Sequence, residues 1–293
     1  MAEGGGAAPP MDAMRGSRGV STVIVIVVAI VTFVAGVGLG AFVLAPAPAR
    51  TAPTTIFLGT NTPFPPFEFR NSTTDQLQGF DIEMIETILT RAGYTASQRQ
   101  WTDFRDFQPL LTAVAAGRID IGVGAITLSG STGASRNNTL SFSNSYFLSN
   151  QGILKNAADA TRYCAAANCT VAELNKTTLL VGVQAITTSE FWVEDNLKAV
   201  TGNSHLKIYP DVTQVLTALQ NHVVDIVVID KPAADGISKR NPAFVVGGAI
   251  ITNELYGFCV QKGDPLGLLP KINAQLASMK ADGTYNTILN KWF

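Results

Sequence analysis

Arg136 and Asp230 are the charged residues whose positions in the sequence best suit the binding of a small charged molecule. Arg136 follows an apolar, β-branched segment at residues 119–126, which predicts a buried strand that ends in small and hydroxyl residues. An arginine beside hydroxyl groups and free backbone N–H groups suits a planar carboxylate, because its fork of donors matches two oxygens. The alternative is that Arg136 is a solvated residue of a glycine- and serine-rich loop at residues 130–135.

Asp230 ends a second apolar segment, residues 223–229, and precedes a predicted helix near residues 233–239. Ligands bind at the carboxyl ends of strands in open α/β sheets, so an acidic residue there faces the ligand crevice. The alternative is that Asp230 caps the helix. A hydroxyl cluster, Thr187-Thr188-Ser189, precedes another predicted helix at residues 190–200. It can cap that helix or help to bind an anion, since the first N–H groups of a helix lack internal partners.

The composition argues against several other kinds of function. The 293 residues carry a net charge of −1, and 15% of them are charged, so no basic surface for nucleic acid is indicated. The two histidines, His205 and His222, lie far apart and lack the spacing of metal ligands or of a catalytic triad. We therefore expect no metal site, no cofactor and no nucleic-acid partner.

The three cysteines fall into a close pair and a single residue. Cys164 and Cys169 lie in a loop of small residues, and in such a compartment we favour a short-loop disulfide between them. Cys259 lies in an apolar segment and is interpreted as a small buried residue.

The N-terminal part of the chain predicts a membrane anchor. Residues 20–44 contain no charge, and 25 helical residues are long enough to cross a hydrocarbon core of roughly 30 Å. Arg15 and Arg18 on the preceding flank predict that residues 1–19 form a cytoplasmic or leader segment and that the rest is extracytoplasmic. The alanine- and proline-rich residues 45–53 form an extended linker. Cleavage before residue 20, which would leave the anchor attached, is the alternative fate of the leader.

The remaining residues alternate between strand and helix patterns, which predicts an α/β fold with doubly wound sheets. The first unit has predicted strands at residues 55–59, 97–101 and 119–126 and helices at residues 80–92 and 108–116. Asp81 lies in the first turn of a predicted helix, where the helix dipole favours an acid, so it is not assigned to a site.

Seven segments resemble, in order, the periplasmic amino-acid-binding proteins of ABC transporters, the solute-binding protein family 3. The resemblance covers about residues 55–293. The segments are Phe64-Pro-Pro-Phe-Glu-Phe, Gly79-Phe-Asp-Ile-Glu-Met, Gly117-Arg-Ile-Asp-Ile, Ala125-Ile-Thr-Leu-Ser, Phe142-Ser-Asn-Ser-Tyr, Val224-Asp-Ile-Val-Val-Ile-Asp and Asp282-Gly-Thr-Tyr-Asn-Thr-Ile-Leu-Asn-Lys-Trp-Phe.

The resemblance implies two α/β lobes that are joined by two crossing strands and close around a ligand. Lobe 1 would comprise residues 54–150 and 255–293, and lobe 2 residues 151–254. The crossing strands would lie near residues 151–155 and 249–261.

The resemblance also implies nine ligand-binding residues: Asn61, Phe64, Phe104, Ala125, Thr127, Arg136, Thr187, Thr188 and Asp230. Arg136 would bind the α-carboxylate, with hydroxyl or N–H groups of Thr127 from lobe 1 and of Thr188 and its neighbour Thr187 from lobe 2. The Ala125 carbonyl and the Asp230 carboxylate would bind the α-ammonium group.

The same resemblance bears on the ligand side chain, on which Phe64 and Phe104 would pack. Many relatives carry Asp or Glu where this chain has Asn61, and a cationic side chain would favour that charge. We therefore expect a free amino acid with a neutral side chain, either polar or apolar.

The predicted function is that of a membrane-tethered, extracytoplasmic binding protein that delivers an amino acid to an ABC transporter permease. One alternative is a sensor domain that needs a separate signalling partner. Another is a cyclohexadienyl-dehydratase-like enzyme on the same fold, which would need a general acid in the cleft. Glu68, Glu190 and Glu254 are the candidate acids, and each is also readily interpreted as a surface residue. We therefore predict no catalytic residue.

Overall fold

The computed structural model describes residues 54–164 and 166–293. The predicted leader, the anchor at residues 20–44 and the linker lie outside these residues. Within the described ranges, no helix is both long enough and apolar enough to cross a bilayer.

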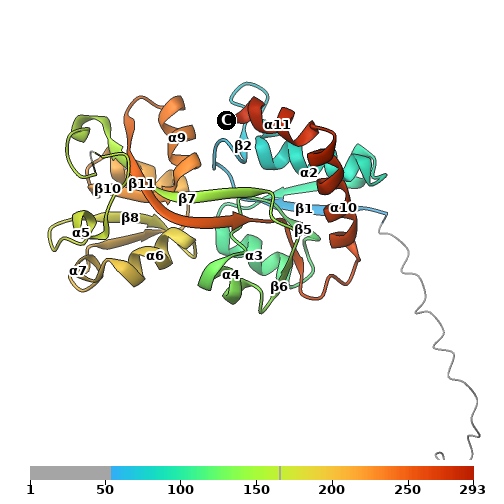
Figure 1. Cartoon of the computed structure of the whole chain (residues 1–293), viewed down its shortest axis with the longest axis horizontal. Coiled ribbons are helices and arrows are strands. Elements are labelled where there is room, and N and C mark those ends of the chain that lie inside the picture. The colour runs from blue at the N-terminus through green and yellow to red at the C-terminus, as the bar shows by residue number, and fades with distance from the viewer. Residues whose placement is uncertain (1–53, 165) are drawn as a thin grey trace, which may run out of the picture. The chain divides into compact units, whose positions relative to one another are not determined.

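Lobe 1 is built on a mixed five-stranded sheet in the order β4-β1-β5-β12-β6 (Figure 1). β1 pairs in parallel with β4 and β5, which confirms the predicted β-α-β-α-β unit, while β12 pairs antiparallel with β5 and β6. The strands are β1 (Ile56–Thr60), β4 (Arg99–Asp103), β5 (Ile121–Gly122), β6 (Leu140–Phe142) and β12 (Cys259–Gln261). The helices are α2 (Phe80–Arg91), α3 (Phe107–Ala115), α4 (Gly130–Arg136), α10 (Leu268–Ala281) and α11 (Thr284–Trp292), and β2 (Phe69–Arg70) and β3 (Leu77–Gln78) form a small ribbon.

Lobe 2 is built on a second mixed sheet in the order β11-β7-β10-β8-β9. Its parallel part comprises β10, β8 and β9, and β7 and β11 add to the β10 edge in antiparallel pairing. The strands are β7 (Phe147–Asn156), β8 (Val181–Gln184), β9 (Leu206–Tyr209), β10 (Ile226–Asp230) and β11 (Phe244–Tyr256). The helices are α5 (Val171–Leu174), α6 (Thr188–Asn196), α7 (Lys198–Thr201), α8 (Val212–Gln220) and α9 (Lys231–Arg240), and two short 3₁₀ turns lie at Ala96–Gln98 and Ala157–Asp159.

The strands β7 and β11 connect the two lobes and lie side by side over most of their length (Figure 1). Their register runs from Phe147 opposite Tyr256 to Asn156 opposite Phe244. Because the pairing continues through both lobes, the two connections form one ribbon rather than two separate linkers. The predicted lobe boundaries, between residues 150 and 151 and between 254 and 255, fall inside this ribbon and stay a proposal.

The hydrophobic core includes a cluster that spans both lobes, with Leu58 and Met84 in lobe 1 and Val215 and Val227 in lobe 2. The apolar positions predicted for the helix at residues 80–92 are buried in it: Ile82, Ile85, Ile88 and Leu89. Burial of one apolar face of this helix contributes most of its stability, because short helices are marginal in water.

The segment before Arg136 differs from the prediction. Residues 130–136 form the helix α4, not a loop, and β5 ends at Gly122 instead of residue 126. The chain leaves the sheet here because Gly124 and Ala125 take positive φ angles of 152° and 48°. A Cβ atom on Gly133 would lie 2.1 Å from the backbone of Leu128, so α4 can pack this closely on the bend only because residue 133 is a glycine. Glycine and serine content alone therefore predicted a loop incorrectly.

Cys164 and Cys169 form a disulfide in lobe 2, as predicted for an oxidising compartment. The ammonium group of the buried Lys155 donates hydrogen bonds to the carbonyl oxygens of Ala160, Arg162 and Tyr163, at 2.7, 2.8 and 2.9 Å. These bonds hold the segment that leads into the disulfide against β7. Cys259 is fully buried, as expected, in the core of lobe 1.

Candidate functional site

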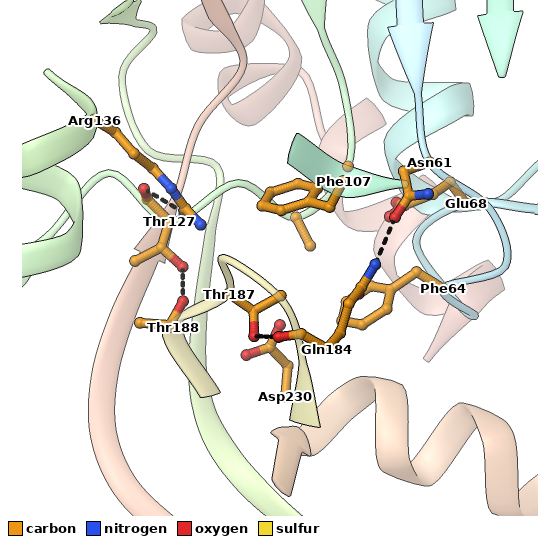
Figure 2. A pocket seen from close by; sticks show the side chains of 12 residues that line it. Asn61, Phe64, Glu68, Phe107, Thr127, Arg136, Gln184, Thr187, Thr188 and Asp230 are labelled. Carbon is orange, nitrogen blue, oxygen red and sulfur yellow. Dashed lines mark hydrogen bonds between the residues drawn. The ribbon is translucent and has the colours of Figure 1, made fainter. Parts of the chain in front are cut away.

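A pocket lies between the two lobes, and Figure 2 shows the twelve residues that line it. They are Asn61, Phe64, Glu68, Phe107, Gly124, Ala125, Thr127, Arg136, Gln184, Thr187, Thr188 and Asp230. The side chains leave only about 30 Å³ that the centre of a water molecule can reach. The two lobes are therefore closed on each other in this structure.

The pocket brings together eight of the nine predicted residues, and Phe104 is the exception. The aromatic ring on that wall belongs to Phe107, the first residue of α3. Phe104 packs beside the lobe 1 core and contributes its carbonyl oxygen, which accepts a hydrogen bond from the Asn61 amide at 2.8 Å. Phe104 and Phe107 belong to one short segment of aromatic and acidic residues. Which of the two rings faces the pocket depends on the residue at which α3 begins.

Arg136 is the last residue of α4 and is only 8% exposed. Its two terminal nitrogens donate hydrogen bonds to the Thr127 carbonyl at 3.1 Å and to the Ile186 carbonyl at 3.2 Å. Its guanidinium group lies 5.3 Å from the centre of the Phe107 ring, within range of a cation–π contact. Burial lowers the pKa of Arg136 to about 10, so the group stays positively charged at neutral pH. The interpretation of Arg136 as a solvated residue is therefore wrong.

The threonines of the two lobes meet beside Arg136. The hydroxyl groups of Thr127 and Thr188 are 2.9 Å apart, and Thr127 also donates to the buried carboxylate of Glu254 at 3.0 Å. Thr187 caps α6 by accepting a hydrogen bond from the Glu190 N–H group at 3.3 Å. Thr187 therefore caps the helix and also lines the pocket, so the two interpretations of this cluster coexist.

Asp230 lies at the carboxyl end of β10, and its side chain makes no capping hydrogen bond to α9. Its carboxylate instead accepts a hydrogen bond from the side-chain amide of Gln151, and it is only 8% exposed. Burial and, to a lesser degree, the nearby Glu254 raise the pKa of Asp230 well above its ordinary value. Its side-chain geometry is therefore that of a pocket residue and not that of a helix cap.

Gln151 is a residue that the sequence patterns did not single out. It lies in β7 directly opposite Asp230, and its amide nitrogen also donates to Glu254 at 2.8 Å. Its amide oxygen accepts a hydrogen bond from the Ser189 hydroxyl at 2.6 Å. Gln151 therefore holds two buried carboxyl groups in place, and because several other residues of β7 are also polar, no sequence signal marks it.

Asn61 and Gln184 meet on the other side of the pocket. The Asn61 amide nitrogen donates to the carbonyl oxygens of Phe104 and Arg105, both at 2.8 Å. Its oxygen accepts a hydrogen bond from the Gln184 amide nitrogen at 3.0 Å, across the two lobes. Because both amide protons are used within lobe 1, the oxygen of Asn61 faces lobe 2.

Glu68 lines the same side of the pocket and is 2% exposed. Its Oε2 atom is buried without a hydrogen-bond partner among the described residues. Burial and the nearby charges of Asp81, Asp230 and Asp103 raise the pKa of Glu68 well above its ordinary value. The surface interpretation of the three candidate acids is thus wrong, because Glu68, Glu190 and Glu254 are all buried.

Asp81 has a larger structural role than the helix dipole explains. It is fully buried and accepts hydrogen bonds from the Ala125 N–H group at 2.7 Å and from the Tyr146 hydroxyl group. Burial raises the pKa of Asp81 to about 6. Because Ala125 has a positive φ angle, which non-glycine residues rarely adopt, Asp81 fixes the bend that exposes Ala125 to the pocket.

The arrangement suits reversible binding of a zwitterion. Arg136 is a fixed cation from lobe 1 and Asp230 a carboxyl group from lobe 2, with hydroxyl groups from both lobes beside Arg136. Across residues 54–164 and 166–293 no cluster of three His, Cys, Asp or Glu side chains is suited to hold a metal ion.

Comparisons with known proteins agree with this architecture. A profile of the bacterial extracellular solute-binding proteins, family 3, matches residues 56–293. The L-cystine-binding protein TcyJ of Escherichia coli K12 is 26% identical over 249 residues, which cover 82% of each chain. The glutamine-binding protein GlnH of Bacillus subtilis 168 is 24% identical over 237 residues, 81% of this chain and 80% of GlnH.

Among solved structures, an ancestral arginine-binding protein with bound glutamine superposes with a TM-score of 0.70 at 30% identity. The match covers 82% of this chain and 98% of that protein. The family profile spans both lobes and every residue that lines the pocket. The chain therefore belongs to family 3 of the bacterial extracellular solute-binding proteins.

Proposed function

We propose that this protein captures an amino acid between its two lobes outside the cytoplasm and delivers it to an ABC transporter permease. The observation that carries the proposal is the placement of Arg136 and Asp230 in one buried pocket, each from a different lobe. A free amino acid has an anionic and a cationic group at a fixed separation, and buried charges are tolerated when they are matched. Curated relatives are named as binding proteins for cystine and glutamine, which supports an amino acid as ligand.

In the proposed complex, the α-carboxylate binds Arg136 together with the hydroxyl groups of Thr127 and Thr188. The α-ammonium group binds Asp230 and the carbonyl oxygen of Ala125. Arg136 now donates to two carbonyl oxygens, so a carboxylate would replace neutral acceptors by a charged one. Charge-assisted hydrogen bonds are roughly twice as strong as neutral ones, which favours that exchange.

We also propose that residues 20–44 anchor the protein in the membrane, with the linker at residues 45–53 carrying the binding lobes on the extracytoplasmic side. The 25 uncharged residues and the two preceding arginines support this orientation. A protease added to intact cells would digest the lobes and leave the N-terminal segment in the membrane fraction. An intact protein after such treatment, with digestion only after lysis, would contradict the orientation.

The experiment that tests the binding function is a thermal-shift screen of the purified full-length chain against the twenty amino acids. A ligand at about 100 times its dissociation constant adds roughly 2.7 kcal/mol of stability. We expect at least one amino acid to stabilise the protein and to be recovered unchanged. Stabilisation only by organic acids that lack an amino group would contradict the role of Asp230.

A further inference from the structure

A simple zwitterion would leave one ionisable side chain of the pocket without a partner. Three lining residues have ionisable side chains: Arg136, Asp230 and Glu68. If the proposed function holds, Arg136 pairs with the α-carboxylate and Asp230 with the α-ammonium group, so Glu68 keeps no partner. A buried carboxylate is tolerated only when it is paired, so a cationic group of the ligand is the partner that would allow Glu68 to ionise.

Glu68 is held in place by its surroundings. Its backbone forms a bridge to Phe64, in which the Phe64 N–H group donates to the Glu68 carbonyl at 2.6 Å. A Cβ atom on Gly124 would lie 3.2 Å from Oε1 of Glu68, so the carboxyl group already packs against this backbone. No lysine or arginine of the described residues lies within ion-pair distance of it.

Asn61 adds a second oxygen on the same side. Its amide nitrogen is occupied by two carbonyl groups of lobe 1, and its oxygen accepts one hydrogen bond, from the Gln184 amide, which leaves its second lone pair for a donor of the ligand. Figure 2 shows Asn61, Glu68 and Gln184 on one side of the pocket and Arg136, Thr127 and Thr188 on the other, with Phe107 between them. The side chain of a bound amino acid that reaches away from Arg136 would therefore meet two oxygen acceptors and aromatic walls.

We propose that the ligand is an amino acid with a cationic side chain, whose second positive charge pairs with Glu68 and hydrogen-bonds to the oxygen of Asn61. This proposal rests on the proposed function and replaces the expectation of a neutral side chain. That expectation depended on Asn61 and on the apolar Ile229 beside Asp230, whereas the structure supplies a carboxyl group seven residues after Asn61. The Phe64 and Phe107 rings suit the apolar stem of such a side chain.

The test compares pairs of ligands that differ in charge but hardly in shape: arginine with citrulline, and lysine with norleucine. Isothermal titration calorimetry on the full-length chain measures each affinity. We expect the cationic member of at least one pair to bind roughly 100-fold more tightly, since a buried charge pair that loses one partner costs about 2–5 kcal/mol. Equal binding of both members, or tighter binding of the neutral ones, would overturn the proposal.

The variant Glu68→Gln sharpens the test. It keeps the shape of the side chain and should reduce the preference for the cation about tenfold or more, with little change for the neutral analogue. The matched control is Glu194→Gln, on the exposed face of α6, which should change neither affinity. If the Glu68 variant does not fold, the preference of the wild-type protein alone decides.

The outcomes separate this proposal from the function on which it rests. A neutral amino acid that binds tightly, and no longer binds after Arg136→Ala, would sustain the amino-acid-binding function and overturn the cationic side chain. Failure of every amino acid to bind would overturn both.

Discussion

The two sides of the pocket differ in how far their polar groups are satisfied within the protein. Around Arg136, the guanidinium group and the hydroxyl groups of Thr127 and Thr188 all have partners, and two of these three hydrogen bonds cross between the lobes. Around Glu68, Oε2 of Glu68 and Oδ1 of Asp81 are buried without hydrogen-bond partners among the described residues. These polar groups of the Arg136 side are all hydrogen-bonded within the protein, whereas the two carboxyl oxygens of the Glu68 side are not.

The difference suits the chemistry of amino acids. Every amino acid has the same α-carboxylate, so the side that receives it can be built in advance and can also hold the lobes together. The side chain is what distinguishes one amino acid from another. Buried groups that are left without partners when the wrong ligand binds provide strong discrimination, because each such group carries a desolvation penalty. The unsatisfied side is therefore where we expect specificity to arise.

The largest effect on ligand affinity is expected when the positive charge of Arg136 is removed. Arg136→Ala should weaken amino-acid binding by about 4 kcal/mol, or roughly 1,000-fold, because the buried α-carboxylate loses its charged partner. Calorimetric titration with the ligand found by screening measures this effect. Arg118→Ala, an exposed arginine of lobe 1, is the control and should bind like the wild type. A loss smaller than tenfold in Arg136→Ala would show that the carboxylate binds elsewhere.

A second substitution should move α4, the helix that carries Arg136, without altering any charge. Gly133→Ala places a Cβ atom 2.1 Å from the backbone of Leu128, so α4 must move. We expect the free energy of unfolding to fall by about 3 kcal/mol or more. Urea denaturation measures this loss.

Gly130→Ala is the matched control for this change. Gly130 has a φ angle of 65° but no atom near the added methyl group, so only backbone strain of about 1–2 kcal/mol is expected. An equal loss in the two variants would show that α4 does not depend on the close contact with Leu128.

The buried carboxyl group of Asp81, on the Glu68 side of the pocket, should make the stability of the protein depend on pH. Burial raises the pKa of Asp81 from 3.8 to about 6, so the folded state binds a proton that the unfolded state releases between these values. The stability that this proton provides is complete below pH 3.8 and is lost as the pH rises through about 6. The shift of roughly two units corresponds to about 3 kcal/mol.

Asp81→Asn should flatten that part of the profile, since an amide does not titrate. Urea denaturation between pH 4 and pH 7 measures the difference between the variant and the wild type. Asp75→Asn, whose carboxylate is 84% exposed, is the control and should run parallel to the wild type. A parallel profile for the Asp81 variant would contradict the assigned titration.

The smallest effect is expected from a single hydrogen bond between the lobes. Thr188→Val removes the contact with the Thr127 hydroxyl while keeping the shape of the side chain. A net hydrogen bond contributes about 1 kcal/mol, so the affinity should fall roughly fivefold. Thr213→Val on the exposed face of α8 controls for a general effect of the substitution. An unchanged affinity would show that this bond does not stabilise the closed state.

Local periodicity predicted most of the strands and helices, whereas the set of residues around Arg136 came from the resemblance to the family. Strand periodicity placed Asp230 at the carboxyl end of a buried strand, and the resemblance assigned Arg136 and Thr127 to one carboxylate site. The helix α4 was missed because its stability depends on a close approach of Gly133 to Leu128, which composition does not reveal.

On the other side of the pocket, the sequence indicated Asn61, Phe64 and the acid Glu68, but not the burial of that acid. Glu68 follows a run of prolines and aromatics that reads as an ordinary loop, and only the fold buries its carboxyl group beside Gly124 and Asp81. Gln151 lies far along the chain from Asp230 and Glu254, and its role depends on strand pairing. Long-range burial of charge is a property of the assembled molecule, so local patterns do not report it.

The connectivity of the two sheets has a consequence for the order of events during synthesis. Every strand of the sheet β11-β7-β10-β8-β9 comes from the uninterrupted stretch between Phe147 and Tyr256. The other sheet needs β12, which is made after that stretch and lies between β5 and β6. A chain that emerges from its N-terminus can therefore complete the second sheet while the first still lacks the strand between β5 and β6. The sheet of lobe 1 would then stay incomplete until β12 has been synthesised.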